Sequence, residues 1–231
     1  NATKVGLERL AGFFNDLPLG IDEKQVAGTR QDFIESIVYM LSIGTTKVRG
    51  AKTGGLQAAK SWRCIVLTTG EEPLTTDASQ TGVYTRTLEV YGSPFENENQ
   101  AKNMHDIADS VYGHAGSKFI EKLIKALEGN PNMLKDMHND IQKKLSNAYP
   151  NKMGSHTSSV AVVAVADKFV SDWIFQDEDK SMDMAMQILG NLEDEQEADS
   201  TDRAYEFIRE WTMSNSISFT DKAKERFGFY D

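Results

Sequence analysis

Residues 13–23 read FFNDLPLGIDE, a short apolar stretch that ends in two adjacent carboxylates, Asp22 and Glu23. An apolar run bounded by polar residues predicts a buried strand. Its acidic end has two interpretations. It is either a turn that happens to be acidic, or a site for Mg²⁺ and water at the carboxyl end of a strand, where open α/β sheets gather their functional groups. The remainder of the chain has to decide between them.

The overall composition is that of a globular protein. The chain has 231 residues, of which 39% are hydrophobic and 26% charged, so it can build one large domain or two modest ones. No stretch approaches the roughly 20 consecutive apolar residues of a membrane helix, and no signal peptide opens the chain. The single cysteine, Cys64, lies in the apolar run WRCIVL and is predicted to be a buried structural thiol. A reducing, cytoplasmic setting follows.

Charge is unevenly distributed along the chain. Residues 1–150 contain 17 Lys and Arg against 18 Asp and Glu, whereas residues 151–231 contain 8 against 17. Residues 36–70 contain no acid at all but hold five basic residues, namely Lys47, Arg49, Lys52, Lys60 and Arg63. This basic island is either a contact for a polyanion or a solvated hairpin, and the charge pattern alone leaves both interpretations open.

Apolar periodicity predicts strands and helices in the first part of the chain. Residues 31–43 have helical spacing and stop at Gly44. The stretch at 46–63 that follows is rich in Gly and Lys and indicates a basic hairpin or an ordered loop. The run WRCIVLTTGEEPL (62–74) predicts a strand that is apolar on both faces and therefore central in a parallel sheet. Residues 82–92, GVYTRTLEVYG, alternate in a way that predicts a further strand.

Helical patterns dominate the second part. Two amphipathic helices precede Pro131, and four more follow it, joined by polar loops. Three tryptophans fall on apolar faces and are predicted to be core: Trp62, Trp173 and Trp211. We therefore predict an α/β domain at 1–130 and a helical region at 131–231, with a linker near 149–159.

Nucleotide hydrolysis needs groups that these strands supply in order. It needs a carboxylate for Mg²⁺, a base that orients water, a polar sensor for the γ-phosphate and a positive charge for the transition state. Asp22 suits the metal and Glu23 the base. The second strand ends in Thr68 and Thr69, hydroxyls at the corresponding edge, and Arg86 follows on the predicted third strand. The ordered set favours the Mg²⁺ interpretation over an acidic turn.

Other chemistries find less support. The phosphate-binding pattern GxxxxGK[ST] is absent, and the similar Gly50-Ala51-Lys52-Thr53 lies downstream of the DE strand instead of upstream. No histidine has zinc-site spacing. Ser158 and Ser159 lack a nucleophile elbow and an evident His partner, which argues against serine hydrolase chemistry.

Five segments together resemble the family called domain of unknown function 927: NATKVGLERLAGFFNDLPLGIDE, GTTKVRG, WRCIVLTTGEEPL, GVYTRTLEVYGSPF and YGHAGSKFIEKL. The likeness covers roughly residues 1–127. The family is described as a helicase-like P-loop ATPase of bacteria, prophages and mobile elements, similar in layout to AAA+, RecA-like and superfamily-three motors. The resemblance implies an α/β fold with a partial P-loop NTPase-like sheet, flanked by helices and followed by an all-helical region.

The resemblance also implies roles for individual residues. Asp22 and Glu23 would be the Walker B pair, Thr68 or Thr69 the sensor, and Arg86 an arginine finger acting on a neighbouring subunit. The basic hairpin would touch DNA in the channel of a ring through Lys47, Arg49 and Lys52. The family's Walker A loop lies upstream of Asn1, so we expect this piece alone to bind neither ATP nor Mg²⁺ tightly.

Two functions from different classes remain. The first is a fragment of a helicase-like, Mg²⁺-dependent ATPase that acts on DNA in phage or mobile-element replication, in a cytoplasmic homo-oligomer with no membrane contact. The second is a catalytically inactive scaffold, derived from such an enzyme, that binds nucleic acid or protein.

Overall fold

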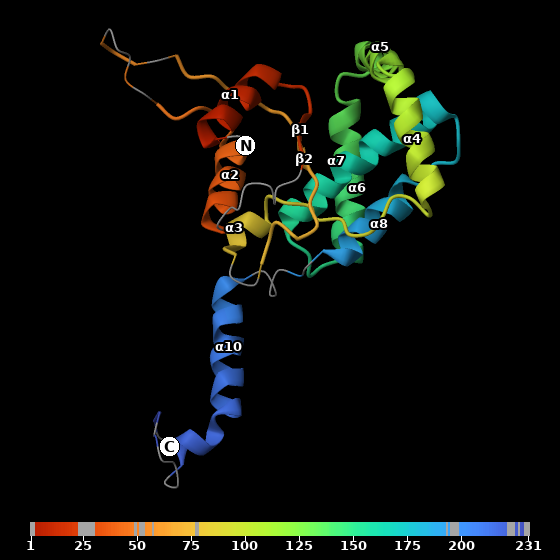
Figure 1. Ribbon diagram of the computed structural model, residues 1–231. Coiled ribbons are helices and arrows are strands. Elements are labelled where there is room, and N and C mark those ends of the chain that lie inside the picture. Colours follow the sequence, from red (N-terminus) through yellow and green to blue (C-terminus); the bar gives the residue numbers. More distant parts are fainter. Residues whose placement is uncertain are drawn as a thin grey trace. The chain divides into compact units, whose positions relative to one another are not determined.

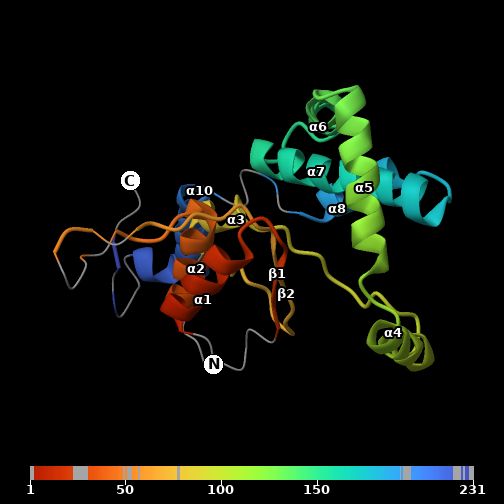
Figure 2. The same cartoon turned by 90° about the horizontal axis from the view of Figure 1, so that it is seen from above.

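The computed structural model describes residues 3–22, 31–48, 50, 54–56, 58–76, 79–192, 194, 199–220, 225 and 227–228. By contacts the chain forms two compact units, shown in Figures 1 and 2. The first consists of Asn1–Thr87 together with Gln196–Asp231, and the second of Leu88–Glu195. The division at residue 130 predicted from the sequence stays a prediction.

The first unit combines a small parallel sheet with helices. Its elements are α1 (Lys4–Phe14), β1 (Leu19–Ile21), α2 (Gln31–Ile43), β2 (Val66–Thr68), α3 (Thr81–Tyr84), α10 (Ser200–Ser214) and the 3₁₀ helix η3 (Ser216–Phe219). Helix α1 packs against α2 and β1, and α2 packs against α3. The combination of helices and a parallel sheet agrees with the predicted α/β class, although a P-loop sheet as such stays a prediction.

Local signals set the ends of α1 and α2. The Thr3 hydroxyl accepts a hydrogen bond from the Gly6 amide at 3.1 Å and so caps the start of α1. Helix α2 stops before Gly44, whose φ of 74° is a left-handed conformation that glycine adopts most readily. The end of α2 therefore lies where the sequence predicts it, and the start of α1 lies at a residue type that commonly caps helices.

Strands β1 and β2 run parallel and side by side. Leu19 pairs with Val66, Gly20 with Leu67 and Ile21 with Thr68. A small core lies beneath them, in which Ala11, Leu19 and Trp62 are buried. Parallel pairing confirms the prediction for this sheet. The predicted burial of β2 on both faces is wrong for this chain, because Leu67 is 61% exposed and the described sheet has only two strands.

The described residues between Thr45 and Ser61 form a hairpin, which is one of the two predicted forms. Thr45 forms an antiparallel bridge with Ser61, and Gly50 forms one with Leu56. The hairpin closes onto the end of α2, where the Trp62 amide donates to the Gly44 carbonyl at 2.8 Å. Its ribbon extends away from α1 and α2 in Figures 1 and 2.

The strand predicted at residues 82–92 is wrong. Residues 81–84 form the short helix α3, and residues 85–91 belong to no strand. Val83 and Tyr84 are adjacent and both buried, which the alternating faces of a half-exposed strand do not allow. The Thr87 hydroxyl also donates back to the Val83 carbonyl at 3.0 Å, the spacing of a helical turn.

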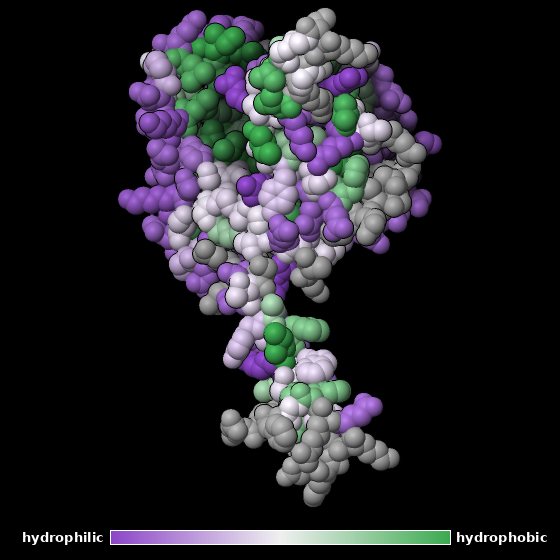
Figure 3. Space-filling model, turned by 90° about the vertical axis from the view of Figure 1, so that its left-hand side faces the viewer, coloured by the Kyte–Doolittle hydropathy of each residue, from purple (hydrophilic) through white to green (hydrophobic). Residues whose placement is uncertain are grey.

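Helix α10 fixes α3 through Arg203. The guanidinium lies 4.9 Å from the centroid of the Tyr84 ring, donates to the Tyr84 hydroxyl at 3.1 Å and donates to the Ser79 carbonyl. Farther along, α10 carries exposed hydrophobic side chains, which include Phe207 and Ile208. Figure 3 shows hydrophobic residues among the hydrophilic ones in the lower part of the molecule. The prediction that Trp211 belongs to the core is wrong, because its side chain is exposed.

The named elements of the second unit are all helices, and an isolated antiparallel bridge joins Lys152 to Asp194. Its elements are α4 (Glu98–Ser110), α5 (His114–Gly129), α6 (Met133–Ala148), α7 (Gly154–Val170), the π-helical turn η2 (Ser171–Phe175) and α8 (Ser181–Asn191). All four helices predicted beyond Pro131 are present, counting α10. Helix α7 begins at Gly154, so the linker predicted near 149–159 includes its first turn.

Helix α7 is the centre of the second unit and packs against α6, α8 and η2. Its small side chains allow this close packing, since Ala161 and Ala164 are fully buried. At its end Trp173 stacks on Phe169 with ring centroids 4.3 Å apart, which agrees with the predicted packing role of this tryptophan.

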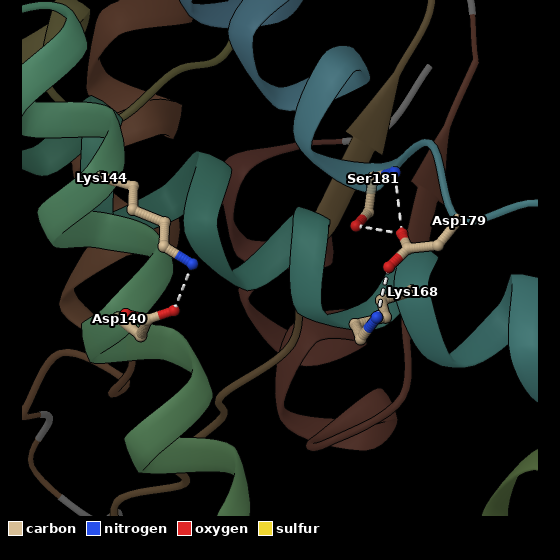
Figure 4. A network of polar contacts seen from close by, with 5 residues as sticks. All are labelled: Asp140, Lys144, Lys168, Asp179 and Ser181. Atoms are coloured by element: carbon tan, nitrogen blue, oxygen red, sulfur yellow. Dashed lines mark hydrogen bonds and ion pairs between the residues drawn. The ribbon is translucent and has the colours of Figure 1, made fainter.

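An ion pair joins the end of α7 to the start of α8. Figure 4 shows Asp179 between the Lys168 ammonium and Ser181, whose amide donates to it at 3.1 Å and whose hydroxyl donates at 2.6 Å. The hydrogen bond from Lys168, with those from Ser181, lowers the pKa of Asp179 from 3.8 to about 2. This carboxylate therefore stabilises the start of α8 as an anion.

Candidate functional site

The parallel pairing of β1 and β2 brings Asp22 and Thr69 together at the carboxyl edge of the sheet. Each is the first residue after its strand, and the Thr69 amide donates to the Ile21 carbonyl at 3.3 Å. The Thr69 hydroxyl donates to Oδ1 of Asp22. Both side chains are exposed. A carboxylate and a hydroxyl, 47 residues apart in sequence, thus share one polar site.

The two predicted sensor hydroxyls differ in position. Thr69 contacts Asp22 directly, whereas the Thr68 hydroxyl donates to the Thr69 carbonyl at a long 3.4 Å. Neighbouring side chains of a strand point to opposite faces, so only one of the two can lie beside the carboxylate. The register makes Thr69 the closer partner of Asp22.

The oxygen ligands at this edge would fill only part of the coordination shell of Mg²⁺. Mg²⁺ prefers oxygen ligands and usually keeps several waters, with one or two carboxylates and substrate phosphates completing its shell. Asp22 offers one exposed carboxylate, one of whose oxygens already accepts from Thr69. Among the described residues no three His, Cys, Asp or Glu side chains form a metal-binding group. Binding of Mg²⁺ by Asp22, through water, stays a prediction.

Three predicted site residues lie outside the described residues: Glu23, Arg49 and Lys52. Their roles as water-orienting base and as DNA contacts stay predictions. Lys47 is described and exposed. Its backbone amide donates to the Glu8 carboxylate at 2.7 Å, and Glu8 lies almost fully buried on α1. A buried acid on α1 thus fixes the backbone of the hairpin beside one of its predicted DNA contacts.

Arg86 follows α3 instead of lying on a strand. Its guanidinium carbon lies 5.1 Å from the centroid of the Tyr39 ring. Nη1 donates to the Gly82 carbonyl at 2.6 Å and to the Thr85 hydroxyl at 3.2 Å. The side chain is exposed. Its predicted role as an arginine finger is neither supported nor opposed by these contacts alone and stays a prediction.

The second unit contains a serine–histidine contact that the sequence did not suggest. Ser158 Oγ lies 3.2 Å from Nε2 of His138, so the expectation that Ser158 lacks a His partner is wrong. The same Nε2 lies 3.1 Å from the Ser158 carbonyl oxygen, which can only accept. A nitrogen that donates to this carbonyl carries the proton and cannot also act as a base for the hydroxyl. The contact therefore holds α6 to α7.

Sequence comparison places a known family at the start of the chain. Residues 1–61 match the family described as "Domain of unknown function (DUF927)". This segment includes β1, the Asp22-Glu23 pair, α2 and most of the hairpin, and the match confirms the family resemblance there. No curated protein matches the chain.

Structural comparison relates the whole chain to a solved helicase. The structure described as "SCCmec type IV Cch - active helicase" matches with a TM-score of 0.72 and 20% sequence identity. The match covers all of this chain and 42% of that one, so the chain spans less than half the length of that helicase. At this identity the likeness shows a shared fold. Among the described helices of our chain, none has the length and apolar composition to span a membrane.

Sequence reasoning missed the residues that hold the predicted ones in place. Glu8 lies within a helical pattern that otherwise gives no sign of a buried acid. Tyr39 and Gly82 belong to separate segments whose contact with Arg86 depends on the packing of α2 against α3. The available signal was Gly82 in the strand predicted at residues 82–92, since a glycine in a strand often marks a place where another group approaches the backbone closely.

Proposed function

We propose that this chain is part of a helicase-like, Mg²⁺-dependent ATPase that acts on DNA in phage or mobile-element replication. The observation that carries the proposal is the pairing of β1 with β2, which sets Asp22 beside Thr69. An acid at the end of one strand and a hydroxyl at the end of its parallel neighbour are the arrangement needed to hold Mg²⁺ and to sense a γ-phosphate. The match of residues 1–61 and the fold shared with a helicase support the same proposal.

The roles within this site follow from chemistry. Asp22 would hold Mg²⁺ through water, and Glu23 would orient the attacking water. Thr69 would sense the γ-phosphate, with its hydroxyl exchanging Asp22 for a phosphate oxygen. Arg86 would contact the nucleotide of a neighbouring subunit, and the hairpin would contact DNA. When bound, Mg²⁺ and ATP supply the electrophilic phosphorus and the neutralisation of its charge.

The test is ATP hydrolysis by the full-length protein. We expect Glu23→Gln to lower kcat by about 100-fold or more while nucleotide binding is retained, because the amide cannot accept a proton from water. Asp22→Ala should lower turnover and also weaken its dependence on Mg²⁺. Asp16→Asn is the matched control, since Asp16 is a partly exposed carboxylate before β1 that pairs with Arg63 at 3.0 Å.

Wild-type turnover in Glu23→Gln would remove Glu23 as the base. Wild-type turnover in both Glu23→Gln and Asp22→Ala would remove the proposed ATPase site. Binding of DNA by the wild-type full-length protein without any ATP hydrolysis would favour the inactive scaffold.

A further inference from the structure

The geometry around Arg86 restrains its side chain without neutralising its charge. The guanidinium lies 5.1 Å from the Tyr39 ring centroid, within the range of a cation–π interaction. Both described hydrogen bonds of the Arg86 side chain are donated by Nη1, one to the Gly82 carbonyl and one to the Thr85 hydroxyl. In the described part of the chain no carboxylate lies within ion-pair distance of Arg86. An aromatic face and a carbonyl hold the cation, and its charge stays available to an external anion.

This arrangement differs from that of two other arginines, which pair with carboxylates, although Arg203 likewise lies against a tyrosine ring. Arg63 pairs with Asp16 at 3.0 Å, and Arg209 pairs with Glu206 at 2.9 Å. A carboxylate partner would compete with a phosphate for the guanidinium, because both are bound by the same planar set of N–H groups. A ring does not compete in this way, since it contacts the face of the guanidinium and leaves the edge for an anion.

Gly82 makes the contact possible. A Cβ built on Gly82 would lie 3.1 Å from Nη1 of Arg86 and would overlap the Tyr39 hydroxyl. Any larger residue at this position would therefore separate Tyr39 from Arg86. The Tyr39 hydroxyl is itself held by Gln80, whose Oε1 accepts from it at 3.2 Å. The side chains of Tyr39 on α2, Gln80 just before α3 and Arg86 in the turn after α3 thus form one contact set.

From these contacts we infer that Tyr39 is the positioning residue of Arg86. Its ring holds the guanidinium in one orientation, and Gly82 admits the ring. A long arginine side chain samples many rotamers in water, so holding it beforehand removes an ordering cost when it meets the transition state. The inference rests on the proposed function, in which Arg86 contacts the phosphates of a nucleotide. In this role Tyr39 would act through Arg86 and not on the substrate itself.

The experiment measures kcat and KM for ATP with the full-length protein in the presence of Mg²⁺. We expect Tyr39→Phe to retain kcat within about 2-fold, because the ring remains. Tyr39→Leu should lower kcat by about 3- to 30-fold, the range of a cation–π contact, with little change in KM. Gly82→Ala should lower kcat similarly. Phe13→Leu is the control, since Phe13 is a highly exposed aromatic residue on α1.

A fluorinated phenylalanine series at position 39 separates the ring's charge distribution from its shape. Successive fluorines weaken the negative face of the ring and change its size little, so kcat should fall stepwise with each fluorine. A structural role for the ring would not produce this gradation. The series also keeps the test valid if Tyr39→Leu does not fold.

Arg86→Ala separates this inference from the function on which it rests. If Arg86→Ala lowers kcat by about 100-fold or more and the fluorinated series is flat, Tyr39 does not position Arg86 and the inference alone is overturned. If Arg86→Ala has wild-type turnover, the proposed role of Arg86 fails and the inference fails with it. A graded series together with an inactive Arg86→Ala supports both.

Discussion

Replacing Gly44 with alanine is expected to destabilise the base of the hairpin. The Gly44 φ of 74° costs an alanine about 1–2 kcal/mol, because its Cβ crowds the following carbonyl. The new Cβ would also lie 2.9 Å from the Trp62 carbonyl oxygen, a backbone atom that cannot rotate away. Overpacking of this kind costs about 1–3 kcal/mol. The lower chain entropy of unfolded alanine offsets about 0.4–1 kcal/mol, so the net loss is about 1–4 kcal/mol.

Two other glycines separate these contributions. Gly54 has a φ of 89°, and a Cβ at this position would meet no atom within 4 Å, so alanine there has the backbone cost alone, about 1 kcal/mol. Gly20 has open space and no positive φ, so Gly20→Ala should be close to neutral. The difference between Gly44→Ala and Gly54→Ala therefore measures the contact with Trp62.

The assay is urea unfolding followed by the fluorescence of Trp62, which is only 3% exposed when folded. Changing Trp173 and Trp211 to phenylalanine leaves Trp62 as the reporter within this chain. With a slope of about 1–3 kcal/mol per molar urea, Gly44→Ala should lower the midpoint by about 1 M. Equal midpoints for Gly44→Ala and Gly54→Ala would refute the close approach to the Trp62 carbonyl. A wild-type midpoint in both would refute the strained backbone as well.

Three further perturbations test other parts of the structure. Lys47→Ala combined with Arg49→Ala in the full-length protein should weaken DNA binding and reduce the slope of log Kd against log salt by about 2, one per lost phosphate contact. Asp179→Asn should remove an acid-sensitive contribution to stability: the folded pKa of about 2 lies below the ordinary 3.8, so this contribution is present above about pH 4 and lost as pH falls toward 2. Arg203→Met should cost roughly 1–3 kcal/mol and speed hydrogen exchange in both α10 and α3, because it removes the hydrogen bonds and ring contact that join them.

Each of these three predictions has a control and an outcome that would contradict it. Lys135→Ala with Lys143→Ala removes the same amount of charge from α6. An equal drop in the salt slope would show that the hairpin makes no specific contact with DNA and contributes only through the net charge of the protein. If wild type and Asp179→Asn lose stability in parallel between pH 4 and pH 2, the Lys168 contact does not act as described. Arg209→Met removes an exposed arginine of α10, and equal exchange in both arginine variants would show that Arg203 does not join α10 to α3.

Much of the secondary structure was predictable because its signals are local. The Thr3 cap, the stop at Gly44 and the apolar stripes of the helices lie within a few residues of the elements they determine. The hairpin followed from glycine and charge in the same way. The strand predicted at 82–92 failed because α3 is determined by distant partners. Arg203, which contacts Tyr84, lies 119 residues away in sequence.

The same distinction between local signals and distant contacts applies to the candidate site. The sequence by itself determined that an acidic pair ends one strand and two threonines end another. Only the tertiary structure decided the register, which sets Thr69 rather than Thr68 beside Asp22. It also decided that Arg86 stacks on Tyr39 across Gly82. The physical reason is that side-chain types and periodicity are encoded locally, whereas contacts between elements depend on the packing of the whole unit.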